Sequence, residues 1–292
     1  MSLADEFPEI TKRNEPLAPF THLTIGGPAE FLVQPRSVDE LNAVLAACQR
    51  DKVPVRMLGG GFNLLVRDEQ VPGAVIRLTA EPFTFLRRDG KKVTAGGGAA
   101  LFDLIAFAVK HGLGGLETLV GIRGTVGGSV RCNVGDRSGE ISQAVRNVTV
   151  LTDAGKVQVR GRDELTFREH DSDIDEAVIL SVEFELETEP SEQVLKKMRK
   201  AWIQRKTSEP LSFQKYVRLF RNPPGNTAAA LIDRAQLTKA RTGAAELSER
   251  NSNYAVAHPG TTARDIIHLA DHVQAKVKER TGVALERELH VW

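Results

Sequence analysis

The sequence predicts an α+β fold that is divided into more than one domain. A strand, a helix and a second strand are indicated in succession between residues 29 and 58, and short strands dominate residues 145 to 188. The chain has 292 residues, of which 41% are hydrophobic. It is therefore long enough to bury the cores of two or three domains.

The strand, helix and strand near the N-terminus give the clearest local signal. Residues 29 to 33 form an apolar run after a glycine-rich turn, and residues 53 to 58 form another. Between them, residues 37 to 50 carry apolar side chains at helical spacing, with Ser37 in position to cap the helix. These three segments predict a βαβ unit.

Strands also dominate the middle of the chain. Residues 74 to 98 predict short strands with a hairpin turn at Asp89-Gly90, and residues 101 to 109 predict a helix. Residues 145 to 188 return to a strand pattern. A charged helix over residues 189 to 208 then connects to a last unit, which contains an amphipathic helix at 261 to 281. The predicted domains are residues 1–80, 81–190 and 191–292.

Charge and cysteine content narrow the functional classes. The formal net charge is +1, which gives no electrostatic reason to expect nucleic acid or a membrane surface as a partner. The two cysteines, Cys48 and Cys132, are far apart, so neither a disulfide framework nor a metal site is predicted. No signal-like or membrane-spanning run is visible. A cytoplasmic protein, monomeric or weakly dimeric, is expected.

Two glycine clusters are the strongest functional signal. Residues 115 to 140 and residues 57 to 66 each carry several glycines, which let the backbone turn tightly and approach a ligand closely. Exposed backbone N–H groups in such segments can bind phosphate. Neither cluster has the Rossmann pattern or the ending of a P-loop. A dinucleotide held mainly by backbone groups is one interpretation, and a pair of glycine-rich connections is the other.

The order of five motifs resembles one enzyme family. The motifs are TIGGPAEFLV at 24 to 33, LGGGFNLLV at 58 to 66, GIRGTVGGSVRCNVG at 121 to 135, FRNPPGN at 220 to 226 and LERELHV at 285 to 291. Together they resemble UDP-N-acetylenolpyruvoylglucosamine reductase (MurB), in the shorter form without a tyrosine-bearing insertion. The resemblance covers nearly the whole chain.

This resemblance implies a three-domain α+β flavoprotein. Its first two domains would hold FAD in the fold of vanillyl-alcohol-oxidase-type (PCMH) enzymes, and the third would bind a UDP-sugar. The implied reaction is the NADPH-dependent reduction of UDP-N-acetylenolpyruvoylglucosamine to UDP-N-acetylmuramate in peptidoglycan synthesis. Hydride addition leaves negative charge that must be stabilised, and a carbon that must be protonated.

The resemblance also implies site residues. Arg168, in FREHDS, and Glu288, in LERELHV, stand at the positions of two catalytic residues of the family, while Arg218 stands where the family has a serine. A guanidinium cannot readily act as a general acid. Arg221 and Asn222 are expected to bind substrate. The expected FAD-binding residues are Gly59, Gly60, Gly61, Phe62, Asn63, Leu64, Gly121, Ile122, Gly124, Thr125, Gly127 and Gly128.

Three further departures surround the expected flavin. Phe62 replaces a serine near the pyrophosphate, Arg123 replaces a proline, and Asn251 stands where a histidine is usual. Phe62 removes one phosphate donor but leaves the backbone amides in place, so weaker FAD binding is expected. An active reductase, a silent homologue with a binding or regulatory role, and another flavin oxidase on the same scaffold are the three hypotheses.

Overall fold

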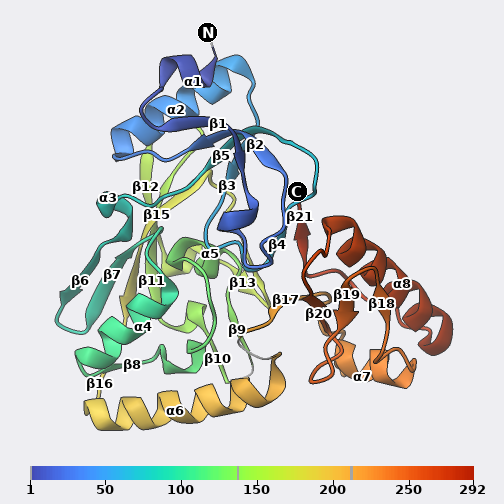
Figure 1. The fold of residues 1–292 in the computed structure, drawn as a ribbon. Coiled ribbons are helices and arrows are strands. Elements are labelled where there is room, and N and C mark those ends of the chain that lie inside the picture. Colours follow the sequence, from blue (N-terminus) through green and yellow to red (C-terminus); the bar gives the residue numbers. More distant parts are fainter. Residues whose placement is uncertain (1, 137, 211–212) are drawn as a thin grey trace. The chain divides into compact units, whose positions relative to one another are not determined.

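A computed structural model describes residues 2–136, 138–210 and 213–292 (Figure 1). The chain forms two compact units, and each is composed of several segments. The first unit contains Met1–Asn14, Glu30–Gly60 and Pro72–Ile203, and the second contains Glu15–Ala29, Gly61–Val71 and Gln204–Trp292. The division into domains 1–80, 81–190 and 191–292 remains a prediction.

The predicted βαβ unit is confirmed in a four-stranded sheet with the order β1-β2-β5-β3. The helix α2 begins after Ser37, whose Oγ accepts a hydrogen bond from the backbone N–H of Glu40 at 3.1 Å. Strands β3 and β5 are parallel. The elements of this region are α1 (Leu3–Glu6), β1 (Thr11–Pro16), β2 (Pro28–Val33), α2 (Val38–Asp51), β3 (Val55–Met57), β5 (Val71–Ile76) and α3 (Glu81–Thr84).

A five-stranded sheet forms the rest of the first unit, with the order β12-β11-β15-β7-β6 and antiparallel pairing throughout. The predicted hairpin is present, and Gly90 takes a φ of 58° in its turn. The main elements are β6 (Leu86–Asp89), β7 (Lys92–Gly96), α4 (Leu101–Lys110), α5 (Val126–Arg131), β11 (Val145–Leu151), β12 (Val157–Gly161), β15 (Val178–Glu185) and α6 (Ser191–Ser208).

Short pairs of strands connect these larger elements. They are β8 (Leu113–Gly114) with β16 (Glu187–Thr188), β9 (Gly135–Asp136) with β10 (Gly139–Glu140), and β13 (Phe167–Arg168) with β14 (Asp171–Ser172). Single turns of 3₁₀-helix occur at Ala18–Phe20, Glu117–Leu119, Ile141–Gln143 and Arg162–Glu164. Among the described residues, no helix combines the length and hydrophobicity that crossing a bilayer requires.

The helix α4 packs one face into the core of the first unit, and this face offers a test of the packing. Leu104 is fully buried in that core, whereas Phe102 on the same helix is 66% exposed. We expect Leu104→Ala to lower the free energy of unfolding by about 2–5 kcal/mol, because it leaves a cavity among packed side chains. Phe102→Ala is the matched control and should leave the thermal melting curve nearly unchanged. Equal shifts for the two variants would contradict this packing.

The second unit is built on a four-stranded antiparallel sheet with the order β17-β20-β19-β18. A separate parallel pair joins β4 and β21. The elements are β4 (Leu64–Leu65), β17 (Lys215–Arg218), α7 (Ala228–Arg234), β18 (Arg241–Thr242), β19 (Ala245–Leu247), β20 (Tyr254–Ala257), α8 (Ala263–Thr281) and β21 (His290–Val291). The predicted amphipathic helix corresponds to α8.

Alternation along β17 and β20 gives this sheet one apolar and one polar face. Val217 lies opposite Ala255, and both side chains are buried in the core of the second unit. Side chains of a strand alternate between faces. Tyr216 and Arg218, together with Tyr254 opposite Arg218, therefore occupy the face turned away from that core. We call these three residues and Glu288 the polar sheet face.

Candidate functional site

Segments of the two glycine clusters meet in the first unit. A Cβ atom on Gly59 would lie 2.6 Å from Oγ1 of Thr125, and a Cβ on Gly127 would lie 3.0 Å from the carbonyl oxygen of Gly97. The first distance is shorter than real Cβ contacts, so Gly59 allows an approach that any larger residue would obstruct. We call Gly59, Gly60, Gly124, Thr125 and Gly127 the glycine cradle.

The glycine cradle offers backbone donors for an anion. Within the described part of the chain, no hydrogen bond uses the backbone N–H of Gly59, Gly60 or Gly124. Thr125 caps α5, and its Oγ1 accepts from the N–H of Gly128 at 3.4 Å. Free N–H groups beside closely approaching glycines suit a diphosphate, because successive backbone amides bind phosphate oxygens. The residues present therefore fit the diphosphate of FAD.

The remaining predicted FAD-binding residues have different surroundings. Gly121 has a φ of 89°, and Ile122 donates its backbone N–H to the carbonyl of Leu119 at 3.0 Å. Gly61, Phe62, Asn63 and Leu64 belong to the second unit. There, the Phe62 ring stacks on His22, with 4.8 Å between the ring centroids and 28° between their planes.

The structure brings Arg218 and Glu288 together. Nε of Arg218 lies 3.1 Å from Oε2 of Glu288, and their side chains are 22% and 10% exposed. Hydrogen bonds fix the backbone at Glu288: its N–H donates to the carbonyl of Leu219 at 2.9 Å, and its carbonyl accepts from the Asn63 amide at 3.4 Å. A partly buried ion pair of this kind is much less screened by water than a surface pair.

The neighbouring carboxylate, Glu286, has different surroundings from those of Glu288. Alternation along a strand would put Glu286 and Glu288 on one face, but the only pairing at residues 286 to 288 among the described residues is an isolated bridge between Phe220 and Arg287. The Glu286 side chain is 72% exposed and lies 3.5 Å from Arg221. The Glu286 side chain is therefore surrounded by solvent, whereas the Glu288 side chain is largely buried.

Arg168 belongs to the first unit, whereas Arg218 and Glu288 belong to the second. Arg168 ends the short strand β13, its side chain is exposed, and its carbonyl accepts a hydrogen bond from the Asn133 amide at 2.8 Å. Its exposed guanidinium is accessible to a ligand.

The predicted substrate-binding pair has two roles in the structure. Asn222 Oδ1 accepts the backbone N–H of Ala228 at 3.0 Å, so this side chain stabilises the start of α7. The Nε atom of Arg221 is buried and has no hydrogen-bond partner among the described residues. An unpaired buried donor costs free energy unless a ligand pairs with it, so Arg221 is suited to an anion.

Both tyrosines of the chain lie on the polar sheet face, and sequence reasoning missed them. Their rings make a T-shaped contact, with centroids 5.6 Å apart. The Tyr216 hydroxyl donates to Glu209 at 3.2 Å, and Glu209 pairs with Arg205 at 3.0 Å. Burial, with a smaller contribution from Glu209, raises the pKa of Tyr254. The alternation of Tyr216 and Arg218 in a short strand was the available signal.

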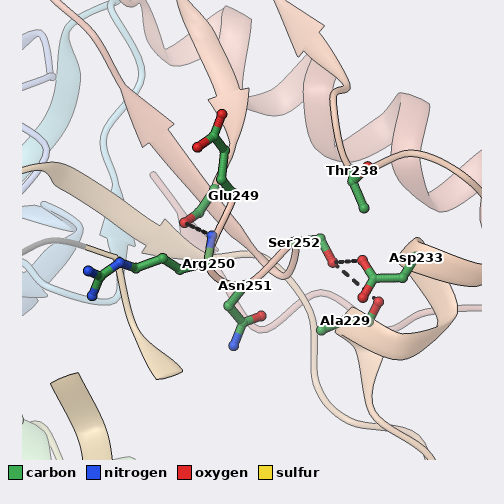
Figure 2. A pocket seen from close by; sticks show the side chains of 8 residues that line it. Ala229, Asp233, Thr238, Glu249, Arg250, Asn251 and Ser252 are labelled. Atoms are coloured by element: carbon green, nitrogen blue, oxygen red, sulfur yellow. Dashed lines mark hydrogen bonds between the residues drawn. The ribbon is translucent and has the colours of Figure 1, made fainter. Parts of the chain in front are cut away.

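A pocket of about 280 Å³ lies in the second unit (Figure 2). Its wall includes Asn251 and Ser252, and the Ser252 hydroxyl donates to Asp233 at 2.7 Å. Pockets for drug-sized ligands usually measure about 300–1,000 Å³. This pocket is therefore too small for a whole nucleotide sugar. No cluster of metal-ligating side chains is present among the residues that the structure describes.

Comparisons with known proteins place this fold in a flavoprotein class. The family described as FAD binding domain matches residues 29–160, and the family described as UDP-N-acetylenolpyruvoylglucosamine reductase, C-terminal domain, matches residues 209–292. The fold is therefore a PCMH-type FAD-binding fold followed by a C-terminal α+β domain.

Full-length relatives define the family more closely. UDP-N-acetylenolpyruvoylglucosamine reductase 2 of Symbiobacterium thermophilum is 36% identical and covers 98% of this chain and 93% of its own. The UDP-N-acetylenolpyruvoylglucosamine reductase of Rhodopirellula baltica is 34% identical, and the match covers 100% of this chain and 97% of that protein. The crystal structure of MurB from Thermus caldophilus matches with a TM-score of 0.82 and 35% identity, over 97% of this chain and 98% of that one. The chain belongs to the UDP-N-acetylenolpyruvoylglucosamine reductase family.

Proposed function

We propose that this protein catalyses the FAD-dependent, NADPH-consuming reduction of UDP-N-acetylenolpyruvoylglucosamine to UDP-N-acetylmuramate in peptidoglycan synthesis. The full-length family match carries the proposal. The glycine cradle supports it, because its free N–H donors compensate for the phosphate-binding hydroxyl that Phe62 lacks. The alternative of a silent homologue is not favoured.

The cofactor would be held mainly by backbone groups. In this proposal, Gly59, Gly60 and Gly124 donate N–H groups to the FAD diphosphate, and Thr125 fixes the turn that presents them. When bound, FAD passes hydride from NADPH to the enolpyruvyl double bond. The first contribution of the chain itself is to position the diphosphate, which anchors the middle of the cofactor.

Arginine side chains would stabilise the negative charge of the substrate. Hydride addition places negative charge on the neighbouring carbon and the carboxylate, and a prealigned cation stabilises such charge. Arg218 is suited to this role because its side chain is 22% exposed and Oε2 of Glu288 lies 3.1 Å from its Nε, which fixes the position of the positive charge. Arg221 would bind an anionic group of the UDP-sugar through charge-assisted hydrogen bonds. The motif FREHDS keeps Arg168 as a proposed catalytic residue.

We further propose a cytoplasmic monomer or weak dimer. No disulfide bond forms among the described residues, as expected in a reducing compartment. Sedimentation over a range of protein concentrations tests the oligomeric state.

Substrate-dependent NADPH consumption tests the function. We expect NADPH to be oxidised only when UDP-N-acetylenolpyruvoylglucosamine is present, and mass spectrometry should find a product heavier by two hydrogen atoms. The same protein incubated with UDP-N-acetylglucosamine, which lacks the enolpyruvyl double bond, is the control. NADPH oxidation that does not depend on the enolpyruvyl sugar but depends on oxygen would favour a flavin oxidase.

A further inference from the structure

The reduction needs a proton as well as a hydride. We compare the residues of the polar sheet face as donors of this proton. This question rests on the proposed function. Arg218 keeps its guanidinium protons in any ordinary conditions. Glu288 forms an ion pair with that guanidinium, so its carboxylate already serves to position Arg218. The ion pair therefore leaves the tyrosines to be considered.

The two tyrosines differ in what their hydroxyl groups do. The Tyr216 hydroxyl donates to Glu209, so its proton is already committed to a carboxylate. Within the described residues, no hydrogen bond engages the Tyr254 hydroxyl. The nearby His22 is 8% exposed, and its ring packs against Phe62 and Tyr216. Its ring therefore fills space in the packing of this region.

Tyr254 also lies next to Arg218, the residue that would stabilise the developing negative charge. It lies directly opposite Arg218 in the antiparallel pair of β17 and β20, and directly opposite residues project on one face with their Cβ atoms about 4.5–5.5 Å apart. Arg218, Glu288, Glu209 and Tyr216 are the charged and titratable groups that act on it. A ligand whose developing charge is stabilised by Arg218 thus comes within reach of the neighbouring phenol.

We propose that Tyr254 donates the proton that completes reduction of the enolpyruvyl group. The double bond receives a hydride at one carbon and the phenolic proton of Tyr254 at the other, where the electron pair of the broken π bond forms the new C–H bond. The resulting phenolate recovers a proton from solvent, and NADPH supplies the two electrons. Because burial raises the pKa of this phenol, Tyr254 carries its proton at neutral pH.

Rapid mixing separates the two half-reactions. In Tyr254→Phe, flavin reduction by NADPH should keep the wild-type rate, whereas reoxidation by UDP-N-acetylenolpyruvoylglucosamine should slow by about 10²- to 10⁴-fold, the usual loss for a missing general acid. Tyr216→Phe is the matched control on the same sheet face and should reoxidise within about twofold of wild type. Wild-type reoxidation in Tyr254→Phe would overturn the proposal.

A titration of the tyrosines gives a readout that does not depend on turnover. The chain has only two tyrosines, so Tyr216→Phe leaves Tyr254 as the sole source of the ultraviolet phenolate signal. UDP-N-acetylmuramate should shift the pH at which this signal appears, because the product carboxylate binds beside the phenol. An unchanged titration with product bound would overturn the proposal. A wild-type protein that does not oxidise NADPH with the sugar would instead overturn the proposed function and, with it, this inference.

Discussion

Glu288→Gln is expected to slow the reoxidation of reduced flavin by the UDP-sugar by about 10²- to 10³-fold, with FAD still bound. The carboxylate holds Nε of Arg218 at 3.1 Å, so removing its charge frees the guanidinium to rotate away from the developing charge. Loss of one aligned electrostatic donor typically costs a factor of this size. Rapid-mixing absorbance measurements would follow the reduction and the reoxidation separately.

A matched variant shows whether the effect belongs to this carboxylate. Glu286 stands two residues away, but its side chain is 72% exposed and only loosely paired with Arg221. Exposed ion pairs contribute little, so Glu286→Gln should reoxidise at nearly the wild-type rate. If Glu288→Gln also reoxidised at the wild-type rate, Glu288 would have no part in the reaction.

Gly59→Ala is expected to weaken FAD binding by about 5- to 150-fold. The added methyl group would lie 2.6 Å from Thr125 Oγ1, so the glycine cradle must shift and its N–H donors must move with it. Overpacking of this kind costs about 1–3 kcal/mol, which corresponds to that change in affinity. Quenching of flavin fluorescence during titration of the apoprotein would give the dissociation constant.

A glycine elsewhere in the same unit provides the control. Gly90 lies in the β6–β7 hairpin, where an added Cβ would meet no atom within 4 Å. Its φ of 58° makes Gly90→Ala unfavourable for the turn, but the glycine cradle is untouched. This variant should melt at a lower temperature and bind FAD normally. Normal FAD affinity in Gly59→Ala would show that the cradle does not hold the diphosphate.

Much of the fold could be predicted because its elements carry strong local patterns. The helix α2 has a cap at Ser37 and the hairpin has Asp89-Gly90, so both follow from short-range chemistry. The helix α5 was not predicted, since its sequence is glycine-rich and intrinsically unfavourable for a helix. Tertiary contacts stabilise it instead: Val126 and Val130 are fully buried in the core of the first unit.

The site was only partly visible in the sequence. Motif order identified Arg218 and Glu288 separately, but their ion pair depends on a bridge between segments that are about 70 residues apart, and no local pattern reports it. Tyr254 escaped notice for a similar reason. It becomes a candidate only when the register of β17 and β20 places it opposite Arg218.

The visible absorbance of the purified protein tests the central claim most directly. We expect a flavin spectrum that NADPH bleaches in the absence of oxygen and that UDP-N-acetylenolpyruvoylglucosamine restores, because the glycine cradle retains donors for the FAD diphosphate. A colourless protein that takes up no added FAD would contradict the account. A bound flavin that NADPH reduces but that the enolpyruvyl sugar does not reoxidise would also contradict the account.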